Sequence, residues 1–178
     1  LNALGLRRYY RWDVTQEKRF TLSEKTLNTL KHIDEGKANI TATLLLGSSP
    51  DSVRIKSLVE DYDRHSGRLK TNELDPYRNK AALDTFVKGL KEKPTTECVI
   101  LQYGDPATDG DSYREKILDV NAFIEYPPMN PMMFRSPPPP KFKGEETLTS
   151  ALKELADPTK PKVYFTVGHG ELDTKSFQ

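Results

Sequence analysis

The residues best suited to chemistry lie near the C-terminus, where His169 and Glu171 alternate with Gly168 and Gly170. The preceding segment, 162–167, is apolar and β-branched, as in a strand. Glycines on both sides of a histidine let the backbone turn tightly, and ligands of α/β folds bind beyond the carboxyl ends of strands. His169 and Glu171 are therefore candidates for an acid–base pair or for half of a metal site. A tight turn held by structural hydrogen bonds is the alternative.

Ser48 and Ser49 form a second candidate, because they follow the strand-like segment 38–46 and precede Pro50. Ser49 suits the N-cap of a helix, and Pro50 suits the first helical position, where a missing N–H costs nothing. The N–H groups of such a helix start can hold a phosphate. The turn nevertheless lacks the lysine and the glycine spacing of a P-loop. Ser48 and Ser49 remain binding candidates beside the plainer reading of a capped turn.

An acidic loop offers a third possibility. Asp105, Asp109 and Asp111 lie with Gly104 and Gly110 in a short polar segment that loosely resembles a loop for a hard cation. The spacing differs from that of an EF-hand, and an ordinary hairpin turn explains the composition equally well. We expect neither a metal nor a cofactor.

Arg11 and Trp12 belong to a basic and aromatic cluster within residues 1–20. Such a cluster suits a membrane surface or an acidic partner. The alternative is a solvated arm whose aromatic side chains pack on the domain. Arg11 and Trp12 are therefore candidate binding residues.

Composition excludes several classes of protein. The chain has 178 residues, with 27 Lys and Arg against 26 Asp and Glu, so there is no basic excess for a nucleic-acid partner. The single cysteine, Cys98, excludes an intrachain disulfide and any CxxC site. No window is apolar enough to span a membrane. Because the sequence begins at Leu1 rather than Met and stops at Gln178 just after a strand-like segment, we expect a piece of a longer protein.

The elements that would position these residues alternate along the chain. Residues 97–103 form an apolar run typical of a central strand, and 113–118 alternate as an edge strand does. Thr21 and Glu24 have the spacing of a capping box. The full set of predicted elements is a helix after Thr21, a strand at 38–46, a helix from Pro50, strands at 68–74, 97–103, 113–118 and 162–167, and helices around 83–90 and 145–155.

The resulting order is a lead helix, then βαβαββα, then a last strand. This order predicts an α/β fold with a thioredoxin-like βαβαββα domain that lacks redox cysteines. We expect an arm at 1–20, this domain at 21–157, and the start of a second α/β domain at 158–178. Seven of the thirteen prolines lie between Pro127 and Pro140, which predicts a Pro-rich loop at 127–143, with an SH3-type ligand as the alternative.

Three stretches together resemble a known family. They are R-W-D-V-T at 11–15 with K-R-F-T-L-S at 18–23, F-K-G-E-E at 142–146, and K-V-Y-F at 162–165 leading into G-H-G-E at 168–171. In this order the chain is similar to the extracytoplasmic region of GldG-like auxiliary proteins of ABC-type transport systems. That family includes gliding-motility components, and its later part is similar to an intraflagellar-transport-related domain.

The resemblance implies a non-enzymatic accessory protein on the periplasmic side of the inner membrane. It implies a transmembrane anchor preceding the stretch at 11–15, removed before Leu1, and partners that are a permease and an ATPase. The protein would act by protein–protein contact or by binding a substrate. Arg7, Arg8 and Arg11 depart from the family, because basic residues outside the membrane oppose the usual bias. The alternative is a hydrolase or amidotransferase-like enzyme that uses His169 and Glu171.

Overall fold

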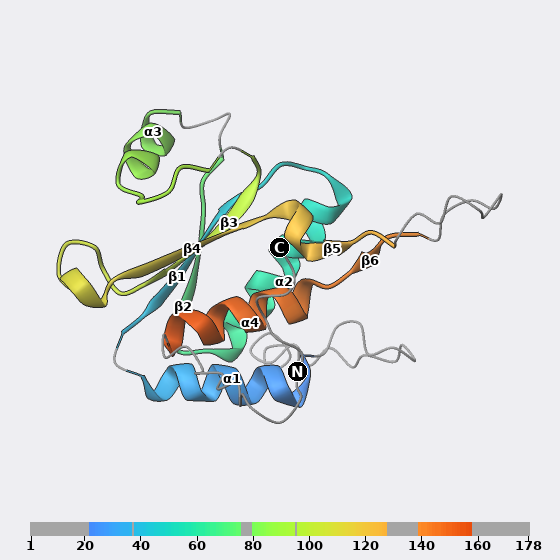
Figure 1. Ribbon diagram of the computed structural model, residues 1–178, viewed down its shortest axis with the longest axis horizontal. Coiled ribbons are helices and arrows are strands. Elements are labelled where there is room, and N and C mark those ends of the chain that lie inside the picture. The colour runs from blue at the N-terminus through green and yellow to red at the C-terminus, as the bar shows by residue number, and fades with distance from the viewer. Residues whose placement is uncertain (1–21, 37, 76–79, 95, 128–138, 158–178) are drawn as a thin grey trace, which may run out of the picture.

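The computed structural model describes residues 22–36, 38–75, 80–94, 96–127 and 139–157 (Figure 1). The elements follow the predicted order, with a lead helix, βαβαββα and two short extra strands. The helices are α1 (Glu24–Glu35), α2 (Pro50–His65), α3 (Lys80–Lys88) and α4 (Gly144–Ala156), and the strands are β1 (Ile40–Leu45), β2 (Leu69–Glu73), β3 (Cys98–Tyr103), β4 (Arg114–Asp119), β5 (Ile124–Glu125) and β6 (Lys141–Phe142).

The main sheet is mixed and has the strand order β2-β1-β3-β4. β1 runs parallel to β2, and β3 runs antiparallel to both of its neighbours, β1 and β4. The first four residues of β3 are buried, as expected of a central strand, whereas β4 lies at an edge. The predicted α/β class and the predicted places of these two strands are confirmed.

Helices cover the two faces of the sheet unequally (Figure 1). α2 and α4 pack on one face, and α1 lies against them, in one large apolar cluster that includes Tyr62, Phe123 and Leu152. The other face carries a small cluster around Cys98 and Ile100, which α3 covers with Leu83 and Phe86. α3 itself buries no side chain completely. The sheet therefore has one thick apolar layer and one thin one.

The N-terminus of α1 differs from the sequence prediction. The N-cap is Ser23, whose hydroxyl accepts a hydrogen bond from the backbone N–H of Thr26. The capping box predicted at Thr21 and Glu24 is therefore wrong for this helix, and Thr21 lies outside the described residues. The carboxylate of Glu145, which begins α4, accepts from the N–H of Ser23 at 2.7 Å. Glu145 thus accepts from the N–H of the N-cap residue, the role that the predicted capping box assigned to Glu24.

The Pro-rich segment begins and ends in a small sheet. β5 and β6 pair antiparallel, with Ile124 opposite Phe142 and Glu125 opposite Lys141. The ends of the predicted loop at 127–143 therefore meet at a two-stranded ribbon, and residues 128–138 lie outside the described part. This ribbon could not be predicted from the sequence, because strands of two residues have no measurable periodicity.

Candidate functional site

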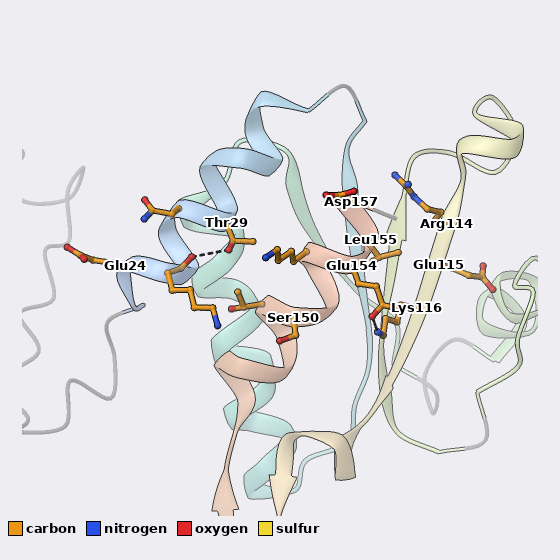
Figure 2. Close-up of a pocket in the computed structure, with 13 residues that line it drawn as sticks. Glu24, Thr29, Arg114, Glu115, Lys116, Ser150, Glu154, Leu155 and Asp157 are labelled. Atoms are coloured by element: carbon orange, nitrogen blue, oxygen red, sulfur yellow. Dashed lines mark hydrogen bonds and ion pairs between the residues drawn. The ribbon is translucent and has the colours of Figure 1, made fainter. Parts of the chain in front are cut away.

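A broad groove of about 1250 Å³ runs over the outer side of α4, with α1 on one flank and β4 on the other (Figure 2). The lining residues are Glu24, Lys25, Asn28 and Thr29 from α1, Arg114, Glu115 and Lys116 from β4, and Thr149, Ser150, Lys153, Glu154, Leu155 and Asp157 from the α4 segment.

Helical periodicity explains why α4 presents polar groups to the groove. Its apolar residues recur at three- and four-residue spacing, so Leu148, Leu152 and Leu155 face the sheet and are buried. Of the residues between them, Ser150, Lys153 and Glu154 are exposed. The same pattern that predicted α4 from sequence therefore also sets the floor of the groove.

The groove is lined by four basic and four acidic side chains. Lys116 of β4 pairs with Glu154 of α4. Within the described residues, the side chains of Lys25, Lys153 and Arg114 form no ion pair with a carboxylate, and Glu24 has no cationic partner. Lys25, Arg114 and Lys153 are thus available to negatively charged groups of a ligand or partner, and Glu24 to positively charged ones.

Arg114 is held in place by an aromatic ring. Its guanidinium stacks over the ring of Tyr103, with 4.3 Å from Cζ to the ring centre. Its Nε is buried and has no hydrogen-bond partner among the described residues. Stacking restricts the long side chain, so less entropy is lost when an anion binds to its remaining donors.

A buried hydrogen-bond network lies beneath one end of the groove. The hydroxyl of Thr149 contacts the hydroxyls of Tyr62 (2.7 Å) and Thr26 (2.9 Å), and Thr26 donates to the carboxylate of Glu145 at 2.6 Å. Burial raises the pKa of Tyr62 to about 12. Burial also raises the pKa of Glu145, but hydrogen bonds from Thr26 and Ser23 outweigh it and bring that pKa below its usual value. The network joins α1, α2 and α4 beneath the groove floor.

The turn at Ser48 and Ser49 is occupied by the protein's own groups. Ser49 caps α2 by accepting from the N–H of Ser52 at 3.1 Å, as predicted. The hydroxyl of Ser52 in turn donates to the carboxylate of Glu97 at 2.8 Å. That carboxylate lies directly against Gly47, where an added Cβ would collide with it. An internal anion therefore already occupies the helix start at which a phosphate was considered.

The acidic loop joins β3 to β4 as a hairpin connection, beside a hollow of about 820 Å³. The carboxylate of Asp109 accepts from the N–H of Asp105 at 2.6 Å, and that of Asp105 accepts from the N–H of Ala107 at 2.8 Å. Gly104 has φ of +79°, a conformation that favours glycine. Two of the three carboxylates are thus used by the turn, and no metal-type cluster of His, Cys, Asp and Glu occurs among the described residues.

Cys98 lies in β3 and is completely buried. Burial, with a smaller contribution from Asp119, raises the pKa of its thiol to about 11. A protonated, covered thiol is a poor nucleophile, so Cys98 is a core residue rather than a candidate for chemistry.

Four of the predicted site residues, Arg11, Trp12, His169 and Glu171, lie outside the described residues. The structure therefore brings together only Ser48 and Ser49 of the original set. Sequence reasoning missed the groove residues, because α1, β4 and α4 are far apart in the chain. The available signal was the polar face of the predicted helix at 145–155, which by itself indicates only solvent.

Searches against protein-family models, curated proteins and solved structures found no match to this chain. Within its described part, no helix combines the length and apolar character that crossing a membrane requires.

Proposed function

We propose that this chain is a non-enzymatic accessory domain of an ABC-type transport or gliding-motility system, acting by contact with other proteins on the periplasmic side of the inner membrane. The observation that carries the proposal is the groove over α4. It is wide and open, it is lined by charged side chains of both signs, and its lining residues contain neither histidine nor cysteine. Such a surface suits binding of a charged protein segment better than acid–base catalysis near neutral pH.

The sheet supports the thioredoxin-like part of the proposal. The strand order is β2-β1-β3-β4, with β1 parallel to β2 and β3 antiparallel to its neighbours. α2 and α4 lie on one face and α3 on the other. This arrangement agrees with a thioredoxin-like domain. The position of a redox motif after β1 holds Ser48 and Ser49 instead of cysteines. The domain would then serve as a scaffold that presents a surface.

The proposed partners are the permease and the ATPase of the same system, with a membrane anchor on the N-terminal side of the described residues. Arg11 and Trp12 would lie near the membrane surface, and residues 158–178 would begin a second α/β domain. Lys25 on the α1 flank and Lys153 on α4 would contact acidic residues of the periplasmic part of the permease.

The test is copurification from native membranes. The full-length protein carries an affinity tag, and the permease and ATPase are quantified in the eluate. We expect both to be enriched, and we expect the double charge reversal Lys25→Glu with Lys153→Glu to reduce their recovery severalfold and to make it less sensitive to salt.

The matched control is Lys88→Glu, an exposed lysine on α3 at the opposite face of the sheet. It changes net charge in the same direction but leaves the groove intact. Wild-type protein that purifies without permease or ATPase would refute the transport role. Equal losses with the groove and control variants would refute the role of the groove.

A further inference from the structure

The two edges of the main sheet differ in whether their outward backbone N–H groups have hydrogen-bond partners. β4 forms one edge and β2 forms the other. Backbone N–H and C=O groups on the outer side of an edge strand have no neighbour in the sheet, and proteins usually cover or block them because such an edge can pair with another chain.

Side chains block much of the β2 edge. The N–H of Leu74 donates to the backbone oxygen of Leu44 in β1. Because successive N–H groups of a strand point to opposite sides, those of Leu69 and Thr71 point outward. The first bonds to the hydroxyl of Ser66 at 3.1 Å, and the second to the carboxylate of Asp63 at 2.8 Å. Both acceptors come from the end of α2 and the turn after it, so the protein's own groups satisfy this edge.

Among the described residues, the β4 edge keeps its outward backbone N–H groups without a partner. The N–H of Val120, just after the strand, donates to the backbone oxygen of Glu97, just before β3. Successive residues of a strand point their N–H and C=O groups to opposite sides, so those of Glu115, Ile117 and Asp119 point away from the sheet. No hydrogen bond within the described part of the chain reaches these outward N–H groups. Their three positions form a row long enough to pair with a short extended segment.

The side chains along this edge differ between its two faces. On the α4 face lie Arg114 and Lys116, next to Lys153 in the groove. On the α3 face Ile117 belongs to the small apolar cluster and lies between the carboxylates of Glu115 and Asp119, which accept hydrogen bonds from the segment 91–96. An added strand would thus meet cations on one face and, on the other, an apolar residue between two carboxylates that the protein's own donors already engage. This pattern matches a strand of alternating acidic and β-branched residues.

We propose that the β4 edge binds an extended, alternately acidic and apolar segment of a partner protein as a fifth, antiparallel strand of the sheet. The backbone of Glu115, Ile117 and Asp119 supplies the hydrogen bonds, and Arg114 with Lys153 selects acidic side chains. The inference concerns this edge alone and does not depend on which system the partner belongs to.

A second copy of the chain is a poorer occupant. In the fully overlapped antiparallel pairing of two β4 strands, centred at Ile117, Glu115 of one copy would lie opposite Asp119 of the other. Two like charges would then face each other at both ends of the pairing, which is unfavourable.

The probe is the heptapeptide Val-Glu-Val-Glu-Val-Glu-Val, titrated calorimetrically into the purified chain. In the proposed antiparallel register the valine N–H groups donate to β4, and the glutamate N–H groups point away. N-methylation of the valines should weaken binding by about tenfold or more, because two or three hydrogen bonds are lost. N-methylation of the glutamates should leave binding unchanged. Because the two methylated peptides have the same side chains, a difference between them reports the backbone hydrogen bonds.

Further readouts identify the site and the charge preference. Hydrogen exchange should slow at the amides of Glu115, Ile117 and Asp119 when peptide is bound. Lys153→Glu should weaken binding severalfold, whereas Lys88→Glu should not, and a peptide with lysine in place of glutamate should bind less tightly. Absence of binding, equal binding of the two methylated peptides, or concentration-dependent dimerisation protecting the same amides would overturn the proposal.

Discussion

At the scale of single residues, Tyr62 holds three helices together through one hydroxyl. It contacts the hydroxyl of Thr149 at 2.7 Å and donates to the backbone oxygen of Glu145 at 3.2 Å, and both partners lie in α4. Thr149 then contacts Thr26 of α1. Because Tyr62 is completely buried, water cannot replace a bond that is lost.

Tyr62→Phe tests the worth of this hydroxyl. We expect the free energy of unfolding to fall by about 1 kcal/mol or more, because Thr149 loses a buried partner. Urea denaturation followed by circular dichroism measures the change. Tyr126→Phe is the control, since that side chain is 64% exposed and should tolerate the change. Equal effects of the two variants would show that the network contributes nothing specific.

Glu145 makes the same network sensitive to acid. Its pKa is lower in the folded chain than the ordinary value of 4.5, because Thr26 and Ser23 donate hydrogen bonds that outweigh the effect of burial. The charged form is thus favoured by folding. Its contribution is fully present above the unfolded pKa and is lost as the pH falls through the folded pKa.

Glu145→Gln should therefore be less stable than wild type at neutral pH, and the difference should shrink as the pH falls below about 4. Urea denaturation at a series of pH values measures this convergence. Burial likewise raises and hydrogen bonds lower the pKa values of Asp34 and Asp63, with a net lowering. The variant should consequently keep some acid sensitivity. The exposed Glu146→Gln serves as control, and a Glu145 difference that is constant with pH would contradict the assignment.

At the scale of elements, the β1–α2 turn gives different roles to Ser48 and Ser49, which were both predicted as binding residues. Ser49 bonds to Ser52 and caps α2, whereas the exposed side chain of Ser48 makes no such contact in the described structure. Ser49→Ala should cost about 1 kcal/mol of stability, and Ser48→Ala should cost almost nothing. Thermal denaturation of both variants measures the contrast. A large loss with Ser48→Ala would reveal a structural role that the geometry lacks.

Local signals predicted this turn well because its capping interactions lie within four residues. Ser49 and Pro50 form a sequence signature, and the structure places the cap there. The N-terminus of α1 was predicted wrongly for the opposite reason. Glu145 lies 122 residues from Ser23, so only the packing of α1 against α4 brings the carboxylate to that helix start. Residues that depend on tertiary packing leave no local trace.

At the scale of the whole molecule, the same distinction explains which parts of the site could be predicted. Element order and the central place of β3 follow from periodicity and apolar runs. The groove forms only because α1, β4 and α4 are adjacent in the folded chain. The β4 edge can be recognised only once it is known which residues of β4 point their backbone N–H groups away from β3. Neither property is encoded in a contiguous stretch of sequence, so both had to come from the assembled sheet.

The unequal faces of the sheet also predict how the molecule opens. Cys98 lies under α3, which covers it through the partly buried Leu83 and Phe86. A segment with few buried contacts detaches at a lower free energy than global unfolding. Native-state labelling of Cys98 by a disulfide reagent should therefore be faster than global unfolding permits. Phe86→Ala should accelerate it by about tenfold for each 1.4 kcal/mol of local stability lost.

Leu152→Ala, on the thick face, is the matched variant for this experiment. Leu152 is completely buried, and its truncation should lower global stability by about 2–5 kcal/mol. Because labelling proceeds through local opening of α3, it should barely change until global unfolding becomes the easier route. Labelling rates that follow global stability in both variants would instead show that the two faces open together, as one cooperative unit with α3 as an integral part.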